Sequence, residues 1–273
     1  MKLGLIGYPL THSLSDKLHN IVLSKLGYDV KYELIEITSS DDLPSFLREA
    51  KERYIGLNVT SPYKEKVMDF LNYINEEAKL IRAVNTIKFN KKRIEGYNTD
   101  AFGFDNLIIH NGIETLHREA LVIGAGGAAR AAIYSLLKLG SCVSIVNRNI
   151  ARSLSVGSHF ICQNYKINVV TFKDSSLKET VRKADILVNA TPVGMYPNVD
   201  ESVIPGNYLR DYTTVIDLVY NPFRTKLIEL ASEKGCRTLN GVDMFVAQAT
   251  KSLNIWLEKG IPLKLVRETF DEL

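Results

Sequence analysis

Several short polar segments before residue 101 carry side chains that could bind and transform a small hydroxylated ligand. They supply hydroxyls, amides, one amine and one carboxylate, from Ser13, Ser15, Asn58, Thr60, Lys64, Asn85 and Asp100. In an open α/β sheet the ligand lies at the carboxyl ends of the strands, and Asn58, Thr60 and Asp100 fit that place. This inventory suits a ligand that has a carboxylate and several hydroxyls.

Lys64 and Asp100 are the pair best suited to acid–base chemistry. Hydride transfer at an alcohol carbon needs a group that gives or takes the hydroxyl proton. The Lys64 ammonium could donate to the oxygen that forms as hydride arrives, while Asp100 could orient the lysine and hold a substrate hydroxyl. A second interpretation also fits: Lys64 is a solvated lysine on a helix, and Asp100 caps the helix that follows it.

A glycine cluster near the middle of the chain predicts a dinucleotide site. The apolar run Ala120–Ile123 leads into three glycines within residues 124–127, and an alanine-rich helical segment, Ala128–Leu139, follows. This is the strand, glycine turn and helix order of a Rossmann fingerprint, with Ala129 in the third position. The glycines allow a tight turn and a close approach to a pyrophosphate at the helix N-terminus. An ordinary strand-to-helix turn is the alternative.

The residues after this turn favour NADP over NAD. An NAD unit usually has an acidic residue after its second strand, where it binds the ribose hydroxyls. Here no Asp or Glu occurs between Glu119 and Asp174, and the second strand ends at Asn147-Arg148-Asn149, with Arg152 one helical turn later. A 2′-phosphate would therefore meet positive charge. A solvated basic surface is the alternative.

Composition excludes several classes of protein. The 273 residues include 34 basic and 31 acidic ones, and a net charge of +3 is too small to indicate nucleic-acid binding. No apolar run reaches membrane-spanning length, and no signal-peptide pattern precedes the first polar segment. Three cysteines form no CxxC pair, and the histidines lack metal-ligand spacing, so His12 and His19 are interpreted as packing or capping residues. We expect a cytoplasmic, metal-free protein that interacts with neither nucleic acid nor membrane.

Strand and helix patterns alternate along the chain and predict two α/β sheets, the first mostly parallel with an antiparallel addition. The first set has predicted strands at Lys2–Ile6, Val30–Ile37, Tyr54–Thr60, Thr86–Asn90 and Arg93–Tyr97. Its helices are predicted to end at Leu26, to span Asp41–Arg53, and to begin at Ser61-Pro62. The second set has predicted strands at Ala120–Ile123, Val143–Asn147, Ile167–Phe172, Ile186–Ala190, Thr214–Val219 and Arg237–Leu239. Ala101–Asn111 is predicted to be a connecting helix, and the apolar pattern after Gly241 predicts a helix that returns to the first domain.

Taken together, these motifs closely resemble the shikimate dehydrogenase family. The matching segments occur in family order over nearly the whole chain: Gly7-x-Pro9-x-x-His12-Ser13-x-Ser15 with His19-Asn20, NVTSPYK (58–64), AVNT (83–86), GYNTDAFGF (96–104), GAGGAAR (124–130), NRN–AR (147–152), NATPVGM (189–195), DLVYNP (217–222) and GVDMFVAQA (241–249). Such a set is far more specific than the glycine motif alone, and it favours the functional interpretations over the alternatives given above.

The resemblance implies reduction of 3-dehydroshikimate by NADPH to shikimate, a step in making aromatic amino acids. By position, Lys64 is the implied acid/base, with Asp100 beside it, and Ser13 and Ser15 bind the substrate carboxylate. The implied contacts of the hydroxylated ring are Asn58, Thr60, Asn85, Tyr220 and Gln248. The implied NADP(H) contacts are Gly124, Ala125, Gly126, Gly127 and Ala128 at the pyrophosphate, Asn147, Arg148, Asn149 and Arg152 at the 2′-phosphate, Thr191, Leu218 and Gly241 along the nicotinamide, and also Glu76.

The resemblance also implies a two-domain α/β fold with a deep cleft between the domains. Residues 1–101 plus 242–273 would form the open α/β substrate-binding and catalytic domain, and residues 102–241 the Rossmann-type NADP-binding domain. The partners expected are shikimate and 3-dehydroshikimate, and the protein is expected to act as a monomer or homodimer.

Three departures and three alternatives accompany the resemblance. Asp16 stands where the family often has proline, Arg82 replaces a usual glycine, and Phe245 replaces a common leucine.

A quinate/shikimate dehydrogenase with broader substrate and cofactor use is the close alternative, although it would be expected to carry an acidic residue after the second cofactor strand. A methylene-tetrahydrofolate dehydrogenase has similar architecture, but the substrate-loop serines and the Asn98-Thr99-Asp100 segment of this chain argue against it. A non-catalytic regulator that binds NADP or shikimate is the alternative from another class.

Overall fold

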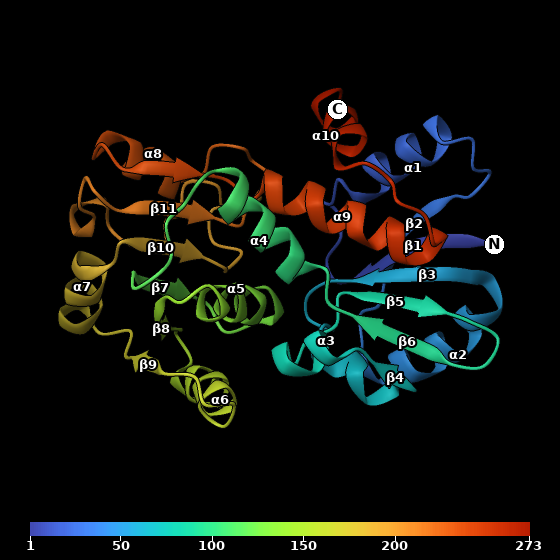
Figure 1. Cartoon of the computed structure of the whole chain (residues 1–273), viewed down its shortest axis with the longest axis horizontal. Coiled ribbons are helices and arrows are strands. Elements are labelled where there is room, and N and C mark those ends of the chain that lie inside the picture. The colour runs from blue at the N-terminus through green and yellow to red at the C-terminus, as the bar shows by residue number, and fades with distance from the viewer. The chain divides into compact units, whose positions relative to one another are not determined.

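The computed structural model describes residues 1–273, except for the side chain of Asp174, and it divides the chain into two compact units. Unit 1 comprises Met1–Gly103 and Phe245–Leu273, and unit 2 comprises Phe104–Met244. Each unit has a six-stranded sheet of its own (Figure 1). The prediction of two α/β sheets is therefore confirmed.

The sheet of unit 1 has the strand order β2-β1-β3-β5-β6-β4. The strands are β1 (Lys2–Gly7), β2 (Tyr32–Glu36), β3 (Tyr54–Val59), β4 (Tyr73–Ile74), β5 (Thr86–Phe89) and β6 (Ile94–Tyr97). β1 pairs in parallel with β2 and β3, whereas β5 is antiparallel to both β3 and β6. The predicted parallel core with an antiparallel addition is confirmed, while β4 carried no clear sequence signal.

The helices that belong entirely to unit 1 are α1 (Ser15–Lys25), α2 (Leu43–Arg53), α3 (Glu76–Ile81) and α10 (Leu263–Asp271). Two further helices begin in one unit and end in the other: α4 (Asp100–His110) and α9 (Val242–Leu257). The unit 1 part of α9 packs on the sheet, where Trp256 Nε1 donates to the carbonyl of Ile87 at 2.8 Å. A Cβ at Gly56 would lie 2.1 Å from that nitrogen, so only glycine permits this approach.

The prediction of a helix that begins at Ser61-Pro62 is wrong. The segment forms turns and then the short 3₁₀ helix η2 (Lys66–Phe70). An α-helix would use the carbonyl of Lys64 within its own ladder, but that carbonyl accepts from the Val84 N–H at 2.8 Å. The long-range bond therefore ends the local helical pattern and fixes the backbone of Lys64.

Arg82 ends α3 in a left-handed conformation, with φ of 58° and ψ of 44°. Its N–H donates to the carbonyls of Ala78 and Lys79, so the C-terminal cap forms without the family's usual glycine. The conformation costs a residue with a Cβ about 1 kcal/mol. Although Arg82 departs from the family pattern, it preserves the turn that leads to Asn85.

The sheet of unit 2 is entirely parallel, in the order β12-β11-β10-β7-β8-β9. Its strands are β7 (Glu119–Ile123), β8 (Cys142–Val146), β9 (Ile167–Val170), β10 (Ile186–Asn189), β11 (Thr214–Asp217) and β12 (Arg237–Leu239). All six strands were predicted, and the order reverses between β7 and β10, the switch point at which doubly wound sheets bind ligands.

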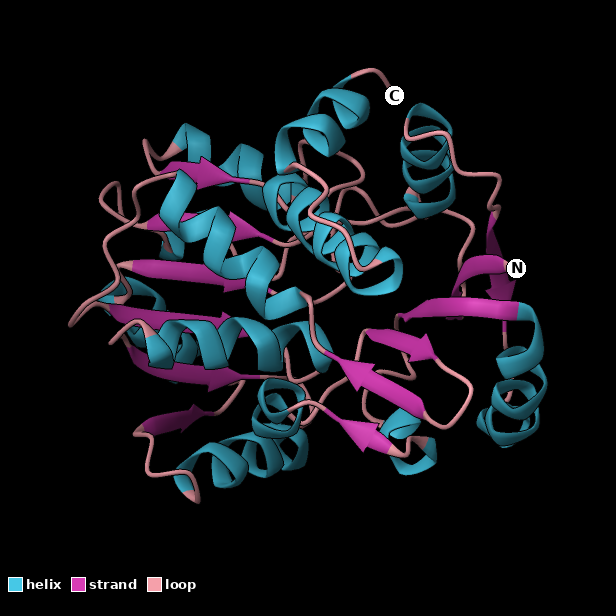
Figure 2. Ribbon diagram, turned by 45° about the vertical axis from the view of Figure 1, so that its right-hand side comes forward, coloured by secondary structure: helices cyan, strands magenta, loops and turns pink.

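Helical segments alternate with these strands along the chain, and Figure 2 shows helices beside the sheet. They are α5 (Gly127–Lys138), α6 (Ile150–Ile161), α7 (Asp174–Lys183) and α8 (Lys226–Glu233), and the 3₁₀ helices η1 (Ser40–Asp42) and η3 (Gly206–Tyr208) complete the two units. Among the residues that the structure describes, no helix combines the length and apolar character needed to cross a membrane.

Candidate active site

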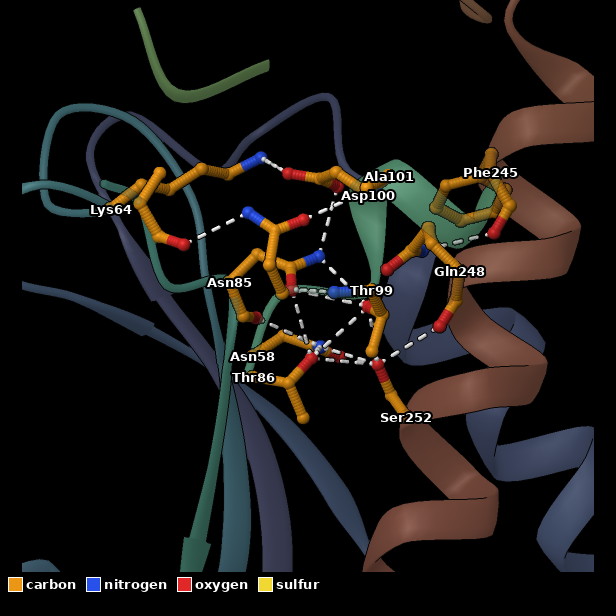
Figure 3. A network of polar contacts seen from close by, with 12 residues as sticks. Asn58, Lys64, Asn85, Thr86, Thr99, Asp100, Ala101, Phe245, Gln248 and Ser252 are labelled. Atoms are coloured by element: carbon orange, nitrogen blue, oxygen red, sulfur yellow. Dashed lines mark hydrogen bonds and ion pairs between the residues drawn. The ribbon is translucent and has the colours of Figure 1, made fainter. Parts of the chain in front are cut away.

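Lys64 and Asp100 form an ion pair in unit 1, with 2.7 Å between Lys64 Nζ and Asp100 Oδ2 (Figure 3). The side chains are 16% and 6% exposed. Asp100 Oδ1 accepts from Asn85 Nδ2 at 2.9 Å, so both carboxylate oxygens are engaged. Lys64 lies outside any helix, and Asn98 Oδ1 rather than Asp100 accepts from the Ala101 N–H at the start of α4. The interpretation as a helical surface lysine and a capping aspartate is therefore wrong.

Below this pair lies a buried set of amides and hydroxyls, here called the unit 1 polar cluster: Asn58, Asn85, Thr86, Thr99 and Ser252. Asn58 Nδ2 lies 3.1 Å from Thr86 Oγ1 and 3.0 Å from Ser252 Oγ. Asn85 Oδ1 accepts from the Thr99 N–H at 2.7 Å. Because each polar group finds a partner, the cluster holds Asn85 in the orientation that Asp100 requires.

Ser252 joins the cluster to α9. Its Oγ lies 2.9 Å from Thr86 Oγ1 and also contacts the carbonyl of Gln248 at 2.9 Å (Figure 3). Gln248 Nε2 in turn donates to the carbonyl of Phe245. Thr86 and Thr99 lie in the motifs AVNT (83–86) and GYNTDAFGF (96–104), although no role was assigned to either from the sequence. Ser252 was not identified, because a buried hydroxyl on a helix has no distinctive spacing.

The two predicted carboxylate-binding serines lie at the start of α1. The Ser15 N–H donates to Ser13 Oγ at 3.2 Å. His19 is fully buried, and its Nδ1 contacts the Ser15 carbonyl at 2.7 Å. Burial lowers the pKa of His19 to about 4, against the raising effect of the bond to Ser15, so the imidazole is neutral. A neutral Nδ1 that faces a carbonyl carries the proton.

His19 also links the serines to the polar cluster. Its ring stacks on Tyr32 with 4.2 Å between centroids, and the Tyr32 hydroxyl donates to Asn58 Oδ1 at 2.8 Å. His19 thus packs as expected, and it connects Ser15 to Asn58. Thr60 follows β3, where its N–H donates to the carbonyl of Ile6. Among the residues predicted to contact the ring, Tyr220 alone lies in unit 2.

The glycine turn of unit 2 leaves room for a phosphate. Gly124 has φ of 126°, and a Cβ there would lie 2.8 Å from the carbonyl oxygen of Ala190. At Gly126, which precedes α5, a Cβ would meet no described atom within 4 Å. The first turn of α5 contains no acidic residue. The open space and the helix N-terminus fit the pyrophosphate of a dinucleotide.

A basic turn follows β8, at the same edge of the sheet. Asn147 Nδ2 donates to the carbonyl of Asn149, and Asn149 Oδ1 accepts from the Ala151 N–H at 3.0 Å, which caps α6. Arg148 and Arg152 are exposed on this turn. Asn149 therefore shapes the turn, and the two guanidinium groups give it the positive charge that suits a 2′-phosphate.

The other predicted cofactor residues are divided between the units. Thr191, Leu218 and Gly241 follow β10, β11 and β12 in unit 2. Glu76 lies on α3 in unit 1, exposed and 2.6 Å from Lys79 Nζ. The cofactor roles of all these residues remain predictions.

The doubly wound unit with its glycine turn is joined to an open-sheet unit that carries a partly buried Lys–Asp ion pair. Together they define a two-unit protein of the dinucleotide-binding oxidoreductase class. Residues 5–87 match the family described as "Shikimate dehydrogenase substrate binding domain", and residues 109–218 match "Shikimate / quinate 5-dehydrogenase". This chain belongs to the shikimate dehydrogenase family.

Individual relatives agree with this assignment. The shikimate dehydrogenase (NADP⁺) of Syntrophomonas wolfei is 38% identical over 97% of this chain and 92% of its own length. The shikimate 5-dehydrogenase of Thermus thermophilus, solved with NADP(H) and shikimate, is 32% identical, with a TM-score of 0.87 over 100% of this chain and 99% of the other. The quinate dehydrogenase of Corynebacterium glutamicum, solved with NAD, is 28% identical, with a TM-score of 0.89 and the same coverage.

Proposed function

We propose that this chain catalyses the reversible reduction of 3-dehydroshikimate to shikimate by NADPH, a step in the biosynthesis of aromatic amino acids. The observation that carries the proposal is the partly buried Lys64–Asp100 ion pair on the polar cluster, within a chain of this family. The three cysteines are free thiols, which fits the cytoplasm as the place of action.

Lys64 acts as the acid and base. During reduction its ammonium donates a proton to the carbonyl oxygen of the substrate, which becomes the alcohol, and solvent then restores the proton. In the reverse direction the neutral amine takes the hydroxyl proton. Asp100 orients Lys64 through the 2.7 Å ion pair and is itself fixed by Asn85. When bound, NADPH supplies the hydride.

The residues of unit 2 fit NADPH by charge and by space. The N-terminus of α5 and the open position beside Gly126 suit the pyrophosphate. Arg148 and Arg152 suit the 2′-phosphate that distinguishes NADP from NAD. The turn after β8 ends without the carboxylate that would hold a free ribose hydroxyl, since its residues are Asn147-Arg148-Asn149.

The first experiment is an absorbance assay at the reduced-nicotinamide band, with shikimate or quinate supplied with NADP or NAD in all four pairings. We expect rapid reduction only with shikimate and NADP. Comparable turnover of quinate or use of NAD would instead assign the broader quinate/shikimate activity. No turnover in any pairing, with ligand binding intact, would identify a regulator.

Replacement of Lys64 tests the acid–base role. Lys64→Ala is expected to lower kcat about 10²–10⁴-fold, the usual contribution of a positioned acid, while NADPH binding stays nearly unchanged. Lys66→Ala is the matched control, because Lys66 is an exposed lysine two residues away. Equal loss of turnover and NADPH affinity would indicate damaged folding and argue against the role.

Replacement of Arg148 tests the cofactor assignment. Arg148→Ala is expected to weaken NADPH binding by about 1.5–3 kcal/mol, the contribution of a charged hydrogen bond, and to change NADH binding little. The measurement is the dissociation constant of each nucleotide by fluorescence titration. An equal effect on both nucleotides would rule out a phosphate contact.

A further inference from the structure

Asp217 is a fully buried carboxylate at the end of β11, outside the set of residues assigned above to substrate or cofactor. Its Oδ1 accepts from Asn189 Nδ2 at 2.9 Å and from the Val219 N–H at 3.1 Å. Its Oδ2 accepts from Thr225 Oγ1 at 2.6 Å. Asp217 therefore connects the end of β10, its own loop and the start of α8.

The link to β10 continues to a predicted nicotinamide contact. Asn189 Oδ1 accepts from both the N–H and the hydroxyl of Thr191, at 3.1 and 2.7 Å. The backbone between them lies against the glycine turn, since the carbonyl of Ala190 would be 2.8 Å from a Cβ at Gly124. The position of Thr191 thus depends on the Asn189 side chain, which Asp217 holds.

The loop after β11 makes the second connection. The Leu218 N–H donates to the carbonyl of Asn189 at 2.9 Å, and the Gly241 N–H donates to the carbonyl of Val219 at 3.2 Å. Leu218 and Gly241 lie so close together that a Cβ at Gly241 would be 2.2 Å from the Leu218 oxygen. All three predicted nicotinamide residues therefore meet around the bonds that Asp217 accepts.

We propose that Asp217 is a positioning residue that joins the loops after β10 and β11 and so sets the surface that receives the nicotinamide half of the cofactor. The inference rests on the proposed use of NADPH. A single acceptor group serves donors from three segments here. Without it the Val219 N–H and the Thr225 hydroxyl would lose this acceptor in a buried place, and Asn189 Nδ2 would keep only its bond to the Val193 carbonyl. Burial raises the pKa of Asp217 to about 6, against the lowering effects of Thr225, Val219 and Asn189, which agrees with a carboxyl that has only neutral partners.

The test compares two ligands on the full chain, NADPH and adenosine 2′,5′-bisphosphate, which lacks the nicotinamide half. Asp217→Ala is expected to lower hydride transfer about 10²-fold, the effect of a small misplacement near a reacting group. It should also alter the fluorescence of bound NADPH, whereas the affinity for the bisphosphate should stay at the parent value. Asp217→Asn, which keeps an acceptor for Asn189, should restore much of the loss.

Two variants guard against an unfolding artefact. Asp185→Asn removes a carboxylate at the opposite end of the same sheet, where it accepts from the Glu119 N–H, and should leave all readouts unchanged. Asn189→Ala breaks the same link from β10 and should reproduce the phenotype if Asp217→Ala does not fold. Parent-like NADPH fluorescence and turnover in Asp217→Ala and Asn189→Ala, or equal losses of affinity for both ligands, would overturn the proposal. If the parent protein itself does not bind NADPH, that result contradicts the proposed function, and this inference is then contradicted as well.

Discussion

Each unit contains a buried aspartate at a predicted ligand site, and the partners of the two carboxylates differ. Asp100 in unit 1 has the Lys64 ammonium at 2.7 Å and one amide donor, Asn85. Asp217 in unit 2 accepts only from an amide, a hydroxyl and a backbone N–H. No Lys, Arg or His contacts Asp217 among the side chains that the structure describes.

This difference separates two uses of a buried carboxylate. An aspartate beside a cation directs that cation, which suits a site where a proton is transferred. An aspartate among neutral donors is less stable as an anion, and burial raises the pKa of Asp217 to about 6. Its contribution is geometric, because one group accepts hydrogen bonds from several loops.

The largest expected contrast is between Asp100→Asn and Asp217→Asn. Both oxygens of Asp100 accept from nitrogen donors, so an amide there would place an N–H against Lys64 or Asn85. At Asp217 the amide can donate to Thr225 Oγ1 instead. We expect kcat to fall about 10²–10³-fold for Asp100→Asn and less than about tenfold for Asp217→Asn.

The measurement for this contrast is steady-state kinetics with shikimate and NADP, together with thermal unfolding of both variants. A loss at Asp217→Asn as large as that at Asp100→Asn, without a change in unfolding temperature, would show that the two carboxylates are used alike.

The pH dependence of stability gives a contrast of intermediate size. The pKa of Asp217 is raised from 3.8 to about 6, so its contribution to the free energy of unfolding is complete below about pH 4 and is lost as the pH rises through 6. The pKa of His19 in unit 1 is lowered from 6.5 to about 4, so its contribution is complete above pH 6.5 and is lost as the pH falls through 4. Each effect is on the order of 3 kcal/mol.

These opposite slopes can be separated by substitution. Urea unfolding between pH 4 and 7 should show Asp217→Asn gaining stability relative to the parent as the pH rises. His19→Asn should gain relative to the parent as the pH falls. A pH-independent difference for either variant would mean that the corresponding group does not titrate with a shifted pKa.

The smallest effect concerns Arg82, whose left-handed turn leads to Asn85 in unit 1. Arg82→Gly should relieve backbone strain and raise the free energy of unfolding by no more than about 1 kcal/mol, because glycine also gains entropy in the unfolded chain. Thermal unfolding checks this, and kcat should change little. A large change in kcat would show that the backbone turn at Arg82 also controls the positions of the residues in the unit 1 polar cluster.

Most of the fold could be predicted from the sequence, because its strands are short apolar runs and the segments between them have apolar residues at helical spacing. All six strands of unit 2 follow from this pattern. The helix at Ser61-Pro62 was the failure, since the carbonyl of Lys64 bonds to Val84, which is distant in the sequence. Local propensity contains no information about such a bond.

Site residues could be predicted where a sequence motif contains a reactive side chain. They could not be predicted where the role of a residue depends on its burial and its partners in the folded chain. Lys64 and Asp100 were identified by residue type and family motif, and the structure brings them together. Ser252 and Asn189 carry ordinary polar side chains in buried positions, and their importance comes from partners that only the folded chain supplies. Asp217 lies in a motif that was quoted for the resemblance, but its buried neutral surroundings were not visible in the sequence.

Unit 1 is interrupted in the sequence by unit 2, which has a consequence for how the chain is made. A ribosome completes every residue of unit 2 before it reaches Trp256, which packs over Gly56, and Ser252, which closes the polar cluster. Domains generally fold as units during synthesis. Unit 1 begins first in the sequence, but it cannot be completed until α9 and α10 have been synthesised. The nascent chain can therefore contain a folded unit 2 while Asn58 Nδ2 still lacks its contact with Ser252, so the polar cluster is completed only as translation ends.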